Sequence, residues 1–303
     1  MSPENVPDGM RGVFPILVTP FDEQGRVDEE SLRSLIDFNI DAGVHGLGVA
    51  LGSEVFKLGE ADRDAVTSIV VSHVRQRVPV VINTGAPGTD LAVQYSQRAE
   101  ELGADALMVI PPSFMPAGPG EVLAYYKAIS DAVQIPIFLQ DVPSAPIPAG
   151  LALQLAETCE WVRYIKVETV PITTKVADMV TQAGDQLTVF GGAGGGYFIE
   201  EVRRGSMGTM PFCSQPEAFV EVWNLMARGD EQGARAVFDK VIMPINRIAV
   251  QGAGIFYHVH KELLRQRGVI ATNKVRDPAP PVEEQTHREL LDLIAELYPT
   301  STT

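Results

Sequence analysis

The chain has 303 residues, of which 45% are hydrophobic and 21% are charged, an ordinary composition for a globular protein. Its 24 Lys and Arg residues stand against 39 Asp and Glu residues, which gives a formal net charge of −15 at pH 7. A chain with this charge repels polyanions and anionic lipid surfaces. We therefore expect no nucleic-acid partner and no membrane partner.

The two cysteines and the first residues of the chain point to a reducing compartment. Cys159 and Cys213 have no CxxC spacing, and no cluster of His and Cys has the separations of metal ligands. The first residues carry acids and prolines where a secretory signal would carry an apolar run. No apolar stretch approaches the roughly twenty residues of a membrane span. These features predict a cytoplasmic protein without a metal site.

Short apolar runs of the β type recur along the first two thirds of the chain, each separated from the next by a segment of helical length. The eight runs cover residues 13–18, 44–50, 78–83, 106–110, 135–140, 161–167, 187–190 and 207–210. Eight such units in roughly 200 to 250 residues predict a (β/α)8 TIM barrel, because the parallel strands of that fold are buried on both faces.

A doubly wound open sheet is the alternative fold. It usually carries a glycine fingerprint after its first strand, where this chain reads Val18-Thr19-Pro20-Phe21. After about residue 215 the strand pattern stops, and the sequence predicts three or four helices with breaks at Gly229, Gly252 and Gly268. We predict a barrel over residues 1–214 and a helical C-terminal extension over residues 215–303 that packs on it.

The active site of such a barrel lies at the C-terminal ends of its strands, and one of these ends carries a lysine. Lys166 closes the sixth run, and strand alternation places it on one face with Val162 and Tyr164. If this face is the barrel interior, partial desolvation favours the neutral amine that attacks a ketone. Two alternatives remain at this level: Lys166 extends to solvent, or Arg163 is the inward cation.

Two further motifs have competing interpretations. The glycine-rich stretch 191–196 holds no Lys or Arg, so it suits a carboxylate or a close backbone approach better than a phosphate. A flexible turn without a ligand is the alternative. His258 and His260 are two residues apart and face different sides of a helix, so we expect solvated or capping histidines rather than a shared metal.

Several short motifs occur in the order and spacing of one known family. They are GVFPILVTPF from residue 12, GRVD from 25, DR from 62, LGADA from 102, DVP from 141 and IKVE from 165. On these motifs the chain resembles the dihydrodipicolinate synthase and N-acetylneuraminate lyase family of class I aldolases and dehydratases. The resemblance implies an imine between Lys166 and the keto carbon of pyruvate or a longer 2-oxo acid. It also implies that no cofactor is needed, and a homotetramer or homodimer.

The chain departs from the family pattern at functional positions. The family signature Gly-Thr-Thr-Gly-Glu after the second strand is replaced by residues 50–54, which read ALGSE. The tyrosine expected in the fifth strand is Gln140, and a second expected tyrosine falls at Ser113. The family arginine that holds a dicarboxylic substrate is missing, and its position falls near Ala145. Glutamine does not titrate, so lysine synthesis is disfavoured, and the chain looks more like the sugar-acid branch.

We therefore predict a Schiff-base lyase that dehydrates a 2-keto-3-deoxy sugar acid such as L-2-keto-3-deoxyarabonate. A pyruvate-dependent aldolase is the first alternative, since both reactions share an enamine, and a non-catalytic 2-oxo-acid-binding protein is the second. The predicted catalytic residues are Lys166, Glu168, Gln140 and Ser113. The predicted substrate-binding residues are Gly52, Ser53, Asp141, Gly191, Gly192 and Pro211.

Overall fold

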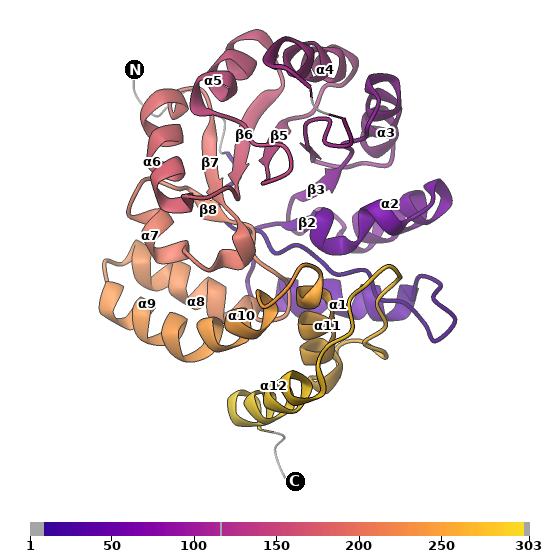
Figure 1. Ribbon diagram of the computed structural model, residues 1–303, viewed down its shortest axis with the longest axis vertical. Coiled ribbons are helices and arrows are strands. Elements are labelled where there is room, and N and C mark those ends of the chain that lie inside the picture. Colours follow the sequence, from indigo (N-terminus) through magenta and orange to yellow (C-terminus); the bar gives the residue numbers. More distant parts are fainter. Residues whose placement is uncertain (1–8, 116, 300–303) are drawn as a thin grey trace. The chain divides into compact units, whose positions relative to one another are not determined.

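A computed structural model describes residues 9–115 and 117–299 of the chain (Figure 1). The strands are β1 (Gly12–Val13), β2 (Leu47–Val49), β3 (Val80–Asn83), β4 (Ala106–Val109), β5 (Ile137–Asp141), β6 (Val162–Val167), β7 (Thr188–Gly191) and β8 (Gly208–Thr209). They form one sheet in the order β1-β8-β7-β6-β5-β4-β3-β2. Each of the eight runs predicted from the sequence contains or overlaps one of these strands.

The helices follow the strands as a barrel requires. They are α1 (Glu29–Asp41), α2 (Glu60–Val74), α3 (Thr89–Glu101), α4 (Pro119–Ala132), α5 (Ala149–Thr158), α6 (Ile172–Ala183), α7 (Phe198–Val202), α8 (Pro216–Ala227), α9 (Glu231–Val237), α10 (Met243–Ala249), α11 (Ile255–Gln266) and α12 (Glu284–Leu297). From β2 to β8, strands that are consecutive in the chain are neighbours in the sheet, and β1 lies beside β8. The backbone N–H of His45 also donates to the carbonyl of Val13 at 2.9 Å, which ties the segment before β2 to β1. The predicted (β/α)8 barrel is confirmed.

The first and last strands are shorter than the apolar runs that predicted them. The backbone N–H of Phe14 still donates to the carbonyl of Thr209 at 2.9 Å, so the segments that contain β1 and β8 stay paired beyond the end of β1. Pro211 has no N–H to donate, so the pairing loses a bond there, although the N–H of Ile16 still donates to the Pro211 carbonyl at 2.7 Å.

The described chain divides into two compact units. The first contains residues 9–14, 45–48 and 78–210, and the second contains residues 15–44, 49–77 and 211–299. This division differs from the boundary at residue 214 that the sequence suggested, because residues 15–44 and 49–77 group with the C-terminal helices.

The interior of the first unit is filled by aromatic rings from several of its strands. Phe138 and Tyr164 stack with ring centroids 4.4 Å apart, and Phe190 meets Phe138 edge-on at 5.5 Å. Phe138 and Tyr164 are register partners on β5 and β6. Because side chains alternate along a strand, the residues two positions further on, Gln140 and Lys166, continue the same inward face. The aromatic layer thus forms a packed base below the C-terminal strand ends.

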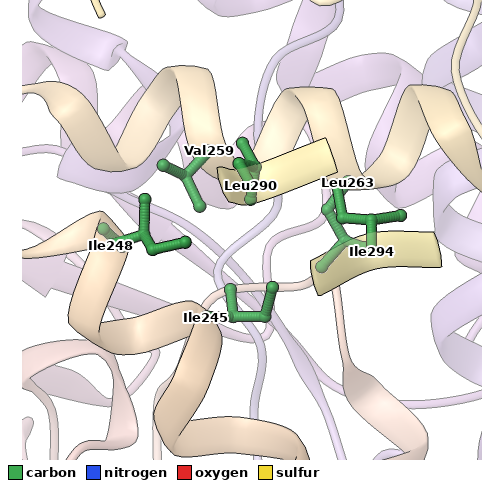
Figure 2. Close-up of a cluster of buried hydrophobic side chains, with 7 residues drawn as sticks. Ile245, Ile248, Val259, Leu263, Leu290 and Ile294 are labelled. Atoms are coloured by element: carbon green, nitrogen blue, oxygen red, sulfur yellow. The ribbon is translucent and has the colours of Figure 1, made fainter. Parts of the chain in front are cut away.

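The second unit holds the C-terminal helices α8 to α12. The sequence predicted three or four helical segments here, and the structure has five α-helices in four segments, because a π-helical turn (Phe238–Ile242) joins α9 to α10. Breaks occur at Gly229, Gly254 and Gly268, where φ is positive. Figure 2 shows a buried apolar cluster of α10, α11 and α12 side chains: Ile245, Ile248, Val259, Leu263, Leu290 and Ile294. Within residues 9–115 and 117–299, no helix is long and apolar enough to cross a bilayer.

Candidate active site

Lys166 lies inside the first unit at the C-terminal end of β6. Its residue is 5% exposed, so it does not extend to solvent. Arg163, the other candidate for the inward cation, is exposed on the opposite face of the same strand. The two alternatives left open by the sequence are therefore resolved, and alternation from Tyr164 gave the orientation of Lys166 correctly.

The ammonium of Lys166 is paired with the carboxylate of Glu168. The distance from Lys166 Nζ to Glu168 Oε1 is 2.9 Å, and the Glu168 side chain is 17% exposed. The backbone N–H of Ala193 donates to the same oxygen at 3.1 Å. Glu168 follows the end of β6, and its side chain still lies on the same face as Lys166. At this distance a proton can pass directly between the two groups.

Gln140 connects Glu168 to Asn83 through two hydrogen bonds. Its Nε2 donates to Glu168 Oε2 at 3.2 Å, and its Oε1 accepts from Asn83 Nδ2 at 3.2 Å. Gln140 and Asn83 are both buried. The amide orients the carboxylate without titrating. Asn83 was absent from the predicted site residues, although it was visible in the sequence as a polar residue at the end of the third apolar run.

The two glycines after β7 make room for carboxyl groups. A Cβ on Gly192 would lie 2.4 Å from Cγ of Glu168, and a Cβ on Gly191 would lie 1.7 Å from Oε2 of Glu201. The sequence left open whether the glycine-rich stretch allows a close approach to its backbone. At Gly191 and Gly192 it does, since the side chains of Glu201 and Glu168 lie where a Cβ would be. The next residues turn through left-handed backbone, with φ of 49° at Ala193, 68° at Gly194 and 74° at Gly195.

Asp141 was predicted to bind substrate, but the structure gives its carboxylate another use. The residue is fully buried, and its two oxygens accept five hydrogen bonds. The donors are the backbone N–H groups of Ile147, Glu168 and Thr169, the Thr169 hydroxyl and the Lys175 ammonium, the last at 2.6 Å. With its acceptor sites engaged, Asp141 anchors the backbone that carries Glu168 instead of facing a ligand.

Ser113 is not brought to this cluster by any hydrogen bond within the described residues. It is exposed in the loop between β4 and α4, next to the exposed side chains of Phe114 and Met115. Its predicted catalytic role finds no support in these contacts.

Three predicted substrate-binding residues belong to the second unit. The Ser53 hydroxyl is buried, accepts from the N–H of Ala50 at 3.0 Å and donates to the carbonyl of Leu17. Gly52 lets the backbone approach Ile16, since a Cβ there would lie 3.1 Å from Ile16 Cγ2. Pro211 accepts the Ile16 N–H at 2.7 Å. The Ser53 hydroxyl and the Pro211 carbonyl thus have backbone partners.

Glu54, the glutamate that survives from the family signature, is also used for structure. It is buried and paired with Lys261 Nζ at 2.5 Å and with Lys57 Nζ at 3.0 Å. Its φ of 58° is left-handed, a conformation held by this network.

The expectation of solvated or capping histidines is wrong for His260. The residue is 2% exposed, its Nδ1 lies 2.7 Å from the Ser214 hydroxyl, and its ring stacks on Phe212. Burial lowers the pKa of His260 to about 3, so the ring stays neutral. Within residues 9–115 and 117–299, no three His, Cys, Asp or Glu side chains gather as a metal ion would require.

A buried lysine paired with a carboxylate at the C-terminal edge of a (β/α)8 barrel defines the class of barrel enzymes with a strand-end amine. The model of the dihydrodipicolinate synthetase family matches residues 9–297. The chain therefore belongs to this family and is a lyase of it.

Named relatives come from more than one branch of the family. The chain is 30% identical over 296 residues to an L-2-keto-3-deoxyarabonate dehydratase of Azospirillum brasilense, an alignment that covers 95% of each chain. It is 28% identical to the putative 2-dehydro-3-deoxy-D-gluconate aldolase YagE of Escherichia coli K12, with 94% and 96% covered. The structure of YagE in complex with pyruvate superposes with a TM-score of 0.88 at 26% identity, covering 95% of this chain and 98% of that one.

Proposed function

We propose that the protein dehydrates a 2-keto-3-deoxy sugar acid, with L-2-keto-3-deoxyarabonate as the leading candidate, through an imine on Lys166 and without a cofactor. The observation that carries the proposal is the 2.9 Å pair of Lys166 and Glu168 at the end of β6. The similarity to the Azospirillum dehydratase supports the sugar-acid branch.

Glu168 provides the proton transfer that imine formation requires. The Lys166 ammonium passes one proton to Glu168 and becomes a neutral amine, which attacks the C2 carbonyl of the substrate. The carbinolamine then loses its oxygen as water, and Glu168 returns the proton that this leaving group needs. In this scheme the nitrogen ends as a protonated imine whose carbon, C2, is bonded to C3.

Elimination follows from the acidity that the imine gives to C3. A base removes a proton from C3 and the electron pair forms an enamine, which expels the hydroxyl group at C4 as it takes up a proton. Glu168 is the titratable side chain in contact with Lys166, so we assign it both transfers. Two further protons then move, one from C5 and one from the C5 hydroxyl to C3 and C4, which leaves an aldehyde at C5. Hydrolysis of the imine by water releases the semialdehyde and the free Lys166.

The aldolase alternative uses the same enamine and rests on the similarity to YagE. It requires a base that removes the proton of the C4 hydroxyl while the C3–C4 bond breaks. The resemblance to the family places a proton-relaying tyrosine at this position, and here Gln140 occupies its place and bonds to Asn83 and Glu168. The absence of a titrating group at this position supports dehydration over cleavage.

Hydride trapping tests the proposal. Borohydride added with pyruvate, and separately with 2-keto-3-deoxy-L-arabonate, should reduce the imine to a stable secondary amine on the peptide that contains Lys166. Lys127→Ala, which removes an exposed lysine of α4, is the control and should be trapped as the parent is. Labelling of another lysine overturns the role of Lys166, and labelling of none overturns the imine mechanism and leaves simple binding as the function.

Product analysis separates the two reactions. Dehydration releases a semialdehyde and no pyruvate, whereas aldol cleavage releases pyruvate and a short aldehyde. A predominance of pyruvate from every 2-keto-3-deoxy sugar acid in a panel would replace the dehydratase assignment with the aldolase. The expectation of a homotetramer or homodimer is checked separately by light scattering of the purified protein.

A further inference from the structure

A second carboxyl group is buried on the other side of the backbone segment that supports Glu168. Glu201, on α7, is fully buried, and neither of its side-chain oxygens has a hydrogen-bond partner among the described residues. Its Oε2 occupies the place that a Cβ on Gly191 would take. An unpartnered buried carboxyl is costly and calls for a functional reason.

The sheet register places a second unpartnered group beside it. Gly191 pairs with Thr209 on β8 and with Val167 on β6, so these three positions form one row across the sheet. The hydroxyl of Thr209 is buried and has no hydrogen-bond partner within the described chain. Since paired residues of parallel strands face the same side, Glu201 and Thr209 contribute polar atoms to the same face of β7 and β8.

Gly191 and Gly192 link this face to the reacting pair. Glu201 packs on Gly191, and Glu168 packs on the next residue, Gly192. The N–H of Ala193 then binds the Glu168 carboxylate. A shift of Glu201 therefore moves the segment that holds Glu168 against Lys166.

We propose that Glu201 is a positioning residue for the Lys166–Glu168 pair, acting as a neutral carboxylic acid that holds the Gly191–Gly192 segment in place. The proposal rests on the function proposed above for that pair. A neutral acid can stay in a dry pocket, whereas an ionised one without partners is driven toward solvent. Ionisation of Glu201 thus releases the support of Glu168 and lowers turnover.

The charges around Glu201 agree with a neutral form. Burial, reinforced by the negative charges of Glu168 and Glu200 and opposed by the Lys166 ammonium, raises the pKa of Glu201 to about 8. Glu201 therefore keeps its proton at neutral pH.

The test compares Glu201→Gln with Glu200→Gln, which removes a partly exposed carboxyl from the same helix. Turnover of the parent should fall as the pH rises above about 8, since Glu201 then ionises. Glu201→Gln, which cannot ionise, should move this alkaline limb of kcat upward by at least one pH unit with little change in KM. Glu200→Gln removes one of the charges that raise the pKa of Glu201, so it should move the limb slightly downward, opposite to Glu201→Gln. An unchanged limb in Glu201→Gln overturns the proposal, and so does inactivity of a folded Glu201→Gln at pH 7.

A second readout does not depend on substrate. Between its ordinary pKa and about 8, Glu201 keeps its proton in the folded protein and loses it in the unfolded chain, so stability falls as the pH rises through this window. The melting temperature of Glu201→Gln should therefore exceed that of the parent by a margin that grows from pH 5 to pH 8. A constant margin overturns the neutral state of Glu201. If hydride trapping fails while this margin is seen, the proposed function is wrong and the buried neutral acid stands.

Discussion

Replacing Gly192 by alanine tests whether Glu168 acts from the place where the structure holds it. The added methyl group would lie 2.4 Å from Cγ and 2.9 Å from Oε1 of Glu168, whereas ordinary contact begins at 3.4 Å. The side chain of Glu168 must therefore move by about 1 Å. The φ of Gly192 is −142°, outside the left-handed region, so the substitution acts through this contact.

A displacement of this size breaks the geometry on which proton transfer depends. Glu168 now lies 2.9 Å from Lys166 Nζ and 3.1 Å from the N–H of Ala193, and both distances would leave the range of a good hydrogen bond. A misplacement of about 1 Å costs roughly a hundredfold in rate, equivalent to about 2.7 kcal/mol of transition-state stabilisation. Overpacking adds a stability cost of about 1 kcal/mol, the low end of the usual range because Glu168 is partly exposed.

The assay measures kcat on the 2-keto-3-deoxy sugar acid identified by the screen, and the rate of hydride trapping with pyruvate. Gly192→Ala should lower both while circular dichroism stays that of the parent. Gly150→Ala is the matched control, because a Cβ at this position of α5 meets nothing within 4 Å and alanine favours a helix. A Gly192→Ala protein with the kcat of the parent would refute the assignment of Glu168 as the proton carrier.

Four further outcomes follow from the same site. Lys166→Ala should abolish turnover and trapping while the melting temperature changes by only a few degrees; a collapsed fold would instead give Lys166 a structural role. Gln140→Tyr should lower kcat by up to roughly a hundredfold through overpacking and loss of two hydrogen bonds, and a faster variant would contradict the dehydratase assignment. Asp141→Asn should cost about 3 kcal/mol in urea unfolding, since it leaves the Lys175 ammonium without its buried partner; a loss below 1 kcal/mol would argue against the anchor. EDTA should leave kcat unchanged, and activity that zinc or magnesium restores would overturn the metal-free mechanism.

Local patterns in the sequence were enough to predict the fold. Eight apolar runs separated by helix-length segments predicted a parallel barrel, and the structure confirms it. The signal is strong because strands buried on both faces must be almost wholly apolar, which few other arrangements require. The exact strand ends were less predictable, since β1 and β8 have two residues each although backbone hydrogen bonds continue their pairing as far as Ile16 and Pro211.

The orientation of Lys166 was also a local property, because the two-residue period of a strand ties it to the face of Tyr164. The residues that contact Lys166 and its neighbours could not be read from local sequence. Gln140 lies opposite Lys166 only through the register of β5 with β6, and Asn83 reaches Gln140 from β3. A period within one strand says which face a side chain takes and nothing about its neighbour on the next strand.

Residues of one chemical type received different roles from their surroundings. Asp141, Glu168 and Glu201 are all carboxylic acids within or close to the C-terminal ends of strands. Asp141 accepts from five donors, Glu168 is paired with Lys166, and Glu201 is buried without a hydrogen-bond partner among the residues that the structure describes. The sequence determined the barrel, the inward lysine and the missing tyrosine, because these depend on residues close together in the chain. Only the tertiary structure decided which carboxyl group is held by five donors, which is paired with Lys166 and which is buried against Gly191, because desolvation and hydrogen bonding are set by residues brought together from distant strands.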